Sequence, residues 1–266
     1  MARTAAGLTA LALLCLAPSA GAASTPYGNA CQLLGQCGAP DTAWGESLHL
    51  GMPMASARAT YQAFLQDYRE SQAPGATLYE TPPQAAASDA PAALSYSLYA
   101  TPLSPEEEAA PSLRRQRHPL YKANLLGDAD GDMIELSITR RYGDPEAGSM
   151  AALADAPLLE AARKDDAEQF GPPTCQTDTL QLWLFDKNAA PIPAAQAASA
   201  DCKRLSTMAL VPYMPSDETT AVMADVGAFI TAIYYPAPDD AGHFRLSSDS
   251  LIVGDYAALK QKAGRR

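Results

Sequence analysis

The chain has 266 residues, of which 19 are Lys or Arg and 30 are Asp or Glu, so its formal net charge is −11. Apolar residues make up 47% of the chain and charged residues 18%, which is enough apolar surface for a folded core. The acidic balance excludes nucleic acid as a partner, because phosphate binding needs a concentrated positive surface.

The first 23 residues have the layout of a secretory signal peptide. Arg3 precedes an apolar run over residues 8–16, Pro18 ends the run, and small residues follow as far as Ala23. Cys15 lies inside the apolar run and not at the cleavage point, which disfavours a lipid anchor. We therefore predict that residues 1–23 are a cleaved signal peptide and that the mature protein is periplasmic or secreted. A buried N-terminal helix is the alternative.

No later stretch reaches the roughly 18 uninterrupted apolar residues of a membrane-spanning helix, so the mature chain is expected to have no transmembrane segment. Removal of the signal peptide leaves four cysteines, and an even number in an exported chain predicts two disulfides. Sequence proximity favours the pairs Cys31–Cys37 and Cys175–Cys202 among three connectivities. A zinc site or a thiol nucleophile is disfavoured, because the chain has no C-x-x-C motif and the compartment is oxidising.

In chain order, the polar and Gly-rich residues 24–46 predict a flexible N-terminal arm. Apolar residues every three or four positions over residues 54–68 predict a helix. Residues 94–99 alternate as a strand does. Residues 121–126 and 133–141 predict a hairpin, and in its second arm Glu135, Ser137 and Thr139 occupy the face opposite the apolar residues.

The second part of the chain predicts a helix over residues 157–170, ended by Gly171-Pro172-Pro173. Residues 179–186 predict a strand buried on both faces, and residues 205–211 another strand. A helix is predicted from Asp217 through Val226 and Phe229. Residues 230–235 either prolong that helix or begin a strand. An apolar stretch at 251–253 and a helix-like segment at 255–262 end the chain.

These elements predict an α+β fold, with antiparallel strands and helices packed on one face. They lack the regular strand–helix–strand rhythm of a parallel sheet. The pattern is also compatible with two related halves, residues 47–145 and residues 146–266. It leaves open whether the halves form one domain or two.

Two short motifs resemble those of SmpA/OmlA-type periplasmic α+β modules. One is Leu50-Gly51-Met52-Pro53 followed by a helix and strands, and the other is Gln169-Phe170-Gly171-Pro172-Pro173-Thr174 followed by a strand through Trp183. The second motif also resembles exported proteins that carry a Trp strand before a Cys-bounded loop. The resemblance implies a binding or scaffolding module with no catalytic residues to transfer. The chain departs from the family, whose members are short lipoproteins, in its greater length and in lacking a lipid-acceptor Cys.

The acidic run over residues 128–132 resembles the start of a calcium loop. Position six of such a loop would be Gly and is Met133, and position twelve would be Glu and is Thr139, so a hairpin turn is favoured. The three histidines lie far apart, and the chain has no zinc-protease, P-loop, nucleophile-elbow or dinucleotide-binding motif. We therefore predict no metal and no cofactor.

The function predicted from these patterns is an exported binding module, active in envelope maintenance or as an inhibitor of another protein. Its expected partner is an envelope protein. The expected surface combines exposed tyrosines with a basic cluster, and its residues are Arg114, Arg115, Arg117, Tyr96 and Tyr99. A solvated loop facing Glu106–Glu108 is the alternative for the arginines, and ordinary sheet packing for the tyrosines. An exported hydrolase with a site assembled from distant residues is the alternative function.

Overall fold

The computed structural model describes residues 25–81, 93–114, 117–142, 153, 156–197, 201–211 and 220–263, without the side chains of Arg114, Thr220, Ala221 and Ala263. Three predictions fall outside these residues. They are the signal peptide at 1–23, the boundary between the halves at 145–146, and the helix start at Asp217.

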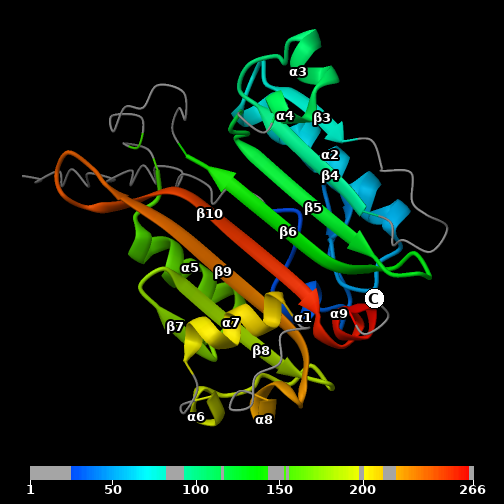
Figure 1. Cartoon of the computed structure of the whole chain (residues 1–266), viewed down its shortest axis with the longest axis vertical. Helices are drawn as coiled ribbons and strands as arrows, with labels where there is room; N and C mark the ends of the chain where they lie inside the picture. Colours follow the sequence, from blue (N-terminus) through cyan, green and yellow to red (C-terminus); the bar gives the residue numbers. More distant parts are fainter. Residues whose placement is uncertain are drawn as a thin grey trace, which may run out of the picture.

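One antiparallel sheet of eight strands runs through the molecule in the order β3-β4-β5-β6-β10-β9-β8-β7 (Figure 1). Strands β3 to β6 form one side of it, which we call the first half, and β7 to β10 form the other, the second half. Strands β6 and β10 pair at the centre, with Ile138 opposite Leu251. Helices and this large antiparallel sheet confirm the α+β fold. The strand bounds are β3 Thr77–Thr81, β4 Ala93–Tyr99, β5 Tyr121–Gly127, β6 Met133–Arg141, β7 Cys175–Thr177, β8 Leu180–Asp186, β9 Val226–Pro238 and β10 Phe244–Asp255.

Two helices cover the face of the sheet that points away from the viewer in Figure 1, which we call the back face. Helix α2 (Met54–Gln72) contacts β3, β4 and β5, and helix α5 (Leu159–Phe170) contacts β9 and β10. Apolar spacing explains α2, because Ala57, Tyr61 and Leu65 follow one another along its buried stripe. Both helices confirm the elements predicted at 54–68 and 157–170.

The segment predicted as a flexible N-terminal arm is anchored in the core, so that prediction is wrong. Tyr27 and Leu33, the latter in α1 (Ala30–Leu33), are buried in the same apolar cluster as α2 and α5. The backbone N–H of Leu50 donates to the carbonyl of Leu33 at 2.9 Å. The segment is polar in overall composition, and its few apolar residues, such as Tyr27 and Leu33, are enough to bury it in the core. A two-stranded sheet follows, β1 (Asp41–Thr42) with β2 (Gly45–Glu46).

The segment between β8 and β9 folds over the front face of the sheet, the face toward the viewer in Figure 1. It contains α6 (Ala194–Ala197), α7 (Cys202–Leu210) and α8 (Thr220–Met223). The predicted strand at 205–211 is wrong, because α7 has an N-cap at Asp201 and buries Leu205, Met208 and Ala209 at helical spacing. Helix α9 (Tyr256–Ala263) packs in the same cluster as α7, so the front face carries helices as well.

The predicted helix through Val226 and Phe229 is also wrong, since both residues lie in β9. Residues 226–235 are rich in β-branched and aromatic side chains, and β9 is held between β8 and β10 over most of its length. Tertiary pairing therefore decides a segment whose apolar run fits either structure. The other predicted strands, including the hairpin β5–β6, are confirmed.

The four cysteines pair as predicted, Cys31 with Cys37 and Cys175 with Cys202. Their Cα atoms lie 5.6 and 5.7 Å apart, a normal separation for disulfides. The second pair joins β7 to the start of α7, so it ties the front cover of the second half to the sheet.

Candidate binding surface

The front of the first half of the sheet, together with the adjoining part of β10, carries polar side chains in cross-strand rows. Three rows follow from the strand register: Ser95–Asn124–Ser137, Lys122–Thr139–Ser250 and Arg141–Ser248. We call these eight residues the open face, because each is at least partly exposed and no helix of the described residues lies in front of the middle of β5 and β6 (Figure 1). Of these two strands, only Ile134, at the start of β6, and Leu126, at the end of β5, share the front apolar cluster with helix α9.

The burial pattern of each strand explains why one half is open and the other is covered. Along β5 buried and exposed residues alternate, so Tyr121, Ala123 and Leu125 face the core while Lys122 and Asn124 face outward. Along β8 the residues from Leu180 to Phe185 are all buried. A strand with apolar residues on both faces needs cover on both, and α7 supplies it in front of β8.

The open face offers hydrogen bonds and positive charge. Its side chains are hydroxyls, one amide and two cations, and the Thr139 and Ser250 hydroxyl oxygens lie 2.9 Å apart. Glu135 is the acidic residue next to it on β6, and burial raises the pKa of its carboxyl, against the influence of Lys262. In a chain of net charge −11, these residues form a positive, hydrogen-bonding surface.

The predicted tyrosine part of the binding patch is wrong, because neither ring is on the surface. Tyr96 is 1% exposed and packs against Tyr61 of α2, with ring centroids 5.4 Å apart. Tyr99 is 5% exposed. Ordinary sheet packing, the alternative for these tyrosines, is what the structure shows.

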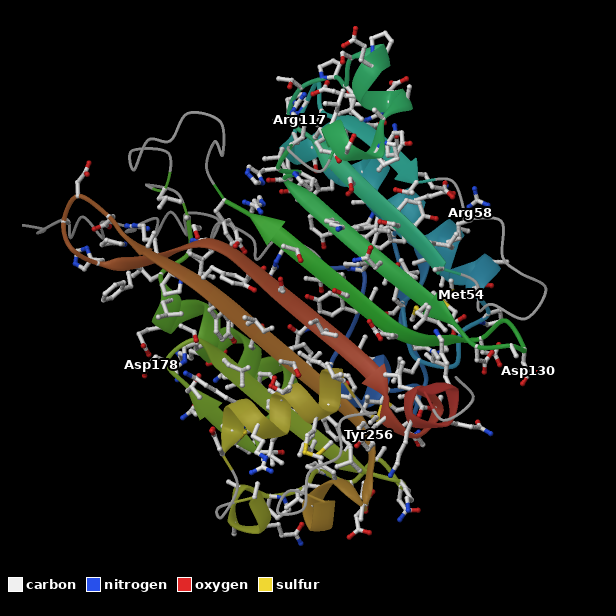
Figure 2. All side chains as sticks on the ribbon, viewed as in Figure 1. Met54, Arg58, Arg117, Asp130, Asp178 and Tyr256 are labelled. Carbon is white, nitrogen blue, oxygen red and sulfur yellow. A yellow bond between two sulfur atoms is a disulfide. The ribbon has the colours of Figure 1, made fainter. Side chains whose placement is uncertain are left out.

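The basic cluster lies beside two short helices, α3 (Pro105–Ala109) and α4 (Pro111–Arg114), and Figure 2 shows Arg117 at this end of the first half. The guanidinium of Arg117 lies 3.0 Å from Glu107 and 5.8 Å from the centre of the Tyr99 ring. Arg115 and the side chain of Arg114 lie outside the described residues. Arg117 is thus engaged within the chain, and a partner-binding role for the three arginines stays a prediction.

The acidic turn is built as a hairpin turn, at the end of the β5–β6 hairpin where Figure 2 labels Asp130. The Asp128 carboxylate accepts hydrogen bonds from the backbone N–H groups of Asp130 at 2.9 Å and Asp132 at 3.0 Å. Gly131 has a φ of 91°, which favours glycine. The part of the chain that the structure describes holds no group of three or more side chains that could bind a metal ion.

Two histidines contact carboxylates, as an acid–base site would require. His49 lies 3.3 Å from Glu46, and His243 lies 3.5 Å from Asp239. The hydrogen bonds described for these rings do not include a serine or cysteine side chain, and Asp239 also binds Arg245 at 2.8 Å. These contacts belong to the local structure of the two loops.

The back face holds an ionic contact where the two halves meet, between a partly exposed arginine and a buried carboxylate. Arg140 of β6 donates to both carboxylate oxygens of Asp249 on β10, at 2.9 and 2.8 Å, and the Tyr142 hydroxyl donates to the same carboxylate at 2.9 Å. The guanidinium is thus neutralised inside the chain. We interpret this contact as the polar link between the halves.

An open hollow of about 510 Å³ lies among the loops that follow β8. Its lining includes Asp186 and Asp225. The Asp186 carboxylate already accepts from the backbone N–H groups of Asn188 and Ala190, at 2.7 and 2.9 Å, so it builds the turn that forms the wall. The open face remains the better candidate surface.

The residues of the open face were not predicted as a binding surface from the sequence. The alternation in residues 133–141 was visible, but its outward residues came from one strand. The cross-strand rows exist only because β6 pairs with β10. The paired residues of these two strands, such as Thr139 and Ser250, are more than a hundred positions apart in the sequence.

The chain matches no protein-family model, no curated protein and no solved structure. Among the described residues, no helix is both long enough and apolar enough to cross a membrane.

Proposed function

We propose that this protein is an exported binding module that captures an envelope protein through the open face. The main observation behind this proposal is that the two halves of the sheet are covered differently at the front. Both halves have a helix at the back, and α7 lies in front of the second half, whereas the described residues place no helix in front of the middle of β5 and β6. Polar side chains in register are costly to collect on one face unless that face contacts water or a polar partner.

The chemistry of the open face indicates the kind of partner. Lys122 and Arg141 are its charged groups, and the remaining side chains can donate or accept hydrogen bonds. Such a surface suits an acidic and polar partner surface, because complementary charge steers encounter and fixes orientation. An inhibitor-like or envelope-maintenance role agrees with this kind of contact.

Export of the chain rests on two features. Residues 1–23 have the layout of a signal peptide, and the four remaining cysteines form two disulfide-distance pairs, which are typical of oxidising compartments. The resemblance to SmpA/OmlA-type modules agrees with a binding role and stays a prediction.

Site-specific photo-crosslinking tests the proposal. A photoreactive amino acid at Asn124 is expected to form a discrete adduct in intact envelopes, whereas the same group at Lys164, exposed on α5 behind the sheet, is expected to form none. Adding Lys122→Glu and Arg141→Glu should abolish the adduct without unfolding the protein. Equal adducts from both positions, or none from Asn124, would contradict the proposal.

A further inference from the structure

A short chain of polar side chains connects α5 to the sheet on the back face, away from the open face. The Tyr234 hydroxyl of β9 lies 2.6 Å from Oδ2 of Asp166 on α5 and 2.7 Å from Oε1 of Gln181 on β8. Tyr234 is 2% exposed and Gln181 is 3% exposed. The hydroxyl and the amide are therefore shielded from water that could replace a missing hydrogen bond, whereas the Asp166 side chain at the rim of the contact is partly exposed.

The orientation of the Gln181 amide follows from its other neighbour. Oε1 of Gln176 accepts from the Arg163 guanidinium at 3.3 Å, and a guanidinium can only donate. The same Gln176 oxygen lies 3.3 Å from Nε2 of Gln181. Gln181 thus turns its amide nitrogen toward Gln176 and its carbonyl oxygen toward Tyr234.

The Tyr234 hydroxyl then faces two acceptor oxygens with one proton. If it donates to an ionised Asp166, the buried Gln181 oxygen has no donor, and if it donates to Gln181, the carboxylate faces a lone pair. A proton on Asp166 resolves the conflict, because Asp166 donates to Tyr234 and Tyr234 donates to Gln181. Unsatisfied buried acceptors are costly, so the geometry favours the protonated acid.

The surrounding charges act in the same direction overall. Burial is the main cause that raises the pKa of Asp166, to about 6, and the negative charges of Asp249 on β10 and Asp165 on α5 add to it. The Tyr234 hydrogen bond and the positive charge of Arg140 on β6 oppose this shift, and Arg140 is already paired with Asp249. Two further groups face the same cluster, Tyr27 of the N-terminal segment and Arg163 of α5.

Helix α5 buries few apolar side chains, so its docking on the sheet depends strongly on the contact between Asp166 and Tyr234. The 12-residue helix buries Leu159 at its start and Phe170 at its end, whereas α2 buries six residues along its length. The N-terminal segment packs against the same helix. The Tyr27 and Phe170 rings stack with their centroids 6.5 Å apart, and the Gln169 amide donates to the Gly28 carbonyl at 3.0 Å.

We propose that a proton on Asp166 docks α5 onto the sheet, and that loss of this proton as the pH rises loosens α5 together with the N-terminal segment. An ionised Asp166, which is partly exposed in the docked helix, is better solvated when the middle of the helix moves outward. The protein would thus be more tightly closed on its back face in an acidic envelope than in a neutral one. This inference does not depend on the open face or its partner.

Amide hydrogen exchange of the full-length mature protein at pH 5.0 and pH 7.5, corrected for intrinsic rates, tests the proposal. Protection of residues 159–170 is expected to fall about tenfold from pH 5.0 to pH 7.5, the change that linkage gives for this carboxyl. Protection of α2 is expected to be the same at both pH values.

Asp166→Asn supplies a permanent donor to Tyr234 and is expected to keep the pH 5.0 protection of α5 at pH 7.5. Asp165→Asn, the neighbouring exposed carboxyl, is the matched control and should keep the wild-type response. Equal protection of wild-type α5 at both pH values would overturn the proposal. So would an Asp166→Asn helix less protected than wild type at pH 7.5, or loss of the response in Asp165→Asn. The wild-type comparison decides alone if the Asn variant does not fold.

Discussion

The two halves of the sheet share a back face but differ at the front. Helices α2 and α5 each cover one half from behind, and β6 and β10 join the halves at the centre. In front, the second half is covered by α7, whereas the first half presents the open face. The halves therefore share a layout of strands and differ in what their connections build.

The connection between β8 and β9 is the source of the difference. It spans residues 187–225, carries α7 over the sheet and is tied to β7 by Cys175–Cys202. The connection between β4 and β5 spans residues 100–120, and its helices α3 and α4 lie at the end of the strands (Figure 1). A longer, cross-linked connection thus completes a two-sided core, and a shorter one leaves a polar surface.

The largest expected effect comes from placing a carboxylate beneath the front cover of the second half, and a carboxylate on the open face is the comparison. Leu182 on β8 is fully buried beneath the front cover, so Leu182→Asp should lower the free energy of unfolding by more than about 4 kcal/mol. Asn124→Asp on the open face should change it by less than about 0.5 kcal/mol. Urea unfolding measures both, and similar losses would show that the two front faces do not differ.

Removal of the long cross-link should weaken the cover of the second half. The Cys175→Ser, Cys202→Ser variant loses a link across 27 residues, which is expected to cost about 3–4 kcal/mol. The Cys31→Ser, Cys37→Ser variant loses a link across 6 residues and should cost about 2 kcal/mol. Thermal unfolding without reductant compares them, and the reverse order would contradict this account.

The contact between the halves should be sensitive to loss of one partner. Asp249→Ala leaves the Arg140 guanidinium without its carboxylate and is expected to cost about 3 kcal/mol. The double variant Arg140→Met, Asp249→Leu removes both charges and should cost less than Asp249→Ala alone. A double variant that is less stable than the single one would refute the interpretation as a polar link.

The last expected effect on stability is the pH dependence from Asp166. Its pKa in the fold is raised to about 6, so the fold holds a proton that the unfolded chain has released above its ordinary pKa of 3.8. Stability should therefore fall as the pH rises from about 4 to about 6, by at most about 3 kcal/mol, and level off above. Urea unfolding of wild type relative to Asp166→Asn isolates this change, and a difference that grows in the opposite direction would contradict it.

Much of the fold could be predicted from local pattern. Regular spacing in residues 54–68 and alternation in residues 133–141 each have one physical interpretation, and both elements are present. Two elements could not be assigned locally. Residues 205–211 and 226–235 are short apolar runs that fit a helix or a strand, and their neighbours in the sheet decide between the two.

The candidate surface could be predicted only in part. Exposed tyrosines were expected at Tyr96 and Tyr99, but strand alternation alone does not tell which face of a sheet meets a helix, and Tyr96 packs against α2. The open face depends on register between β6 and β10 and on the path of the β8–β9 connection. Both are long-range properties, which a local pattern does not encode.

Lysine reactivity in the envelope tests the central claim most directly. Lys122 lies on the open face and Lys164 on the outer side of α5, and both side chains are exposed. Acetylation followed by mass spectrometry should show Lys122 several-fold less reactive in intact envelopes than in the purified protein, with Lys164 unchanged. Unchanged reactivity of Lys122, or equal protection of both lysines, would contradict binding through the open face.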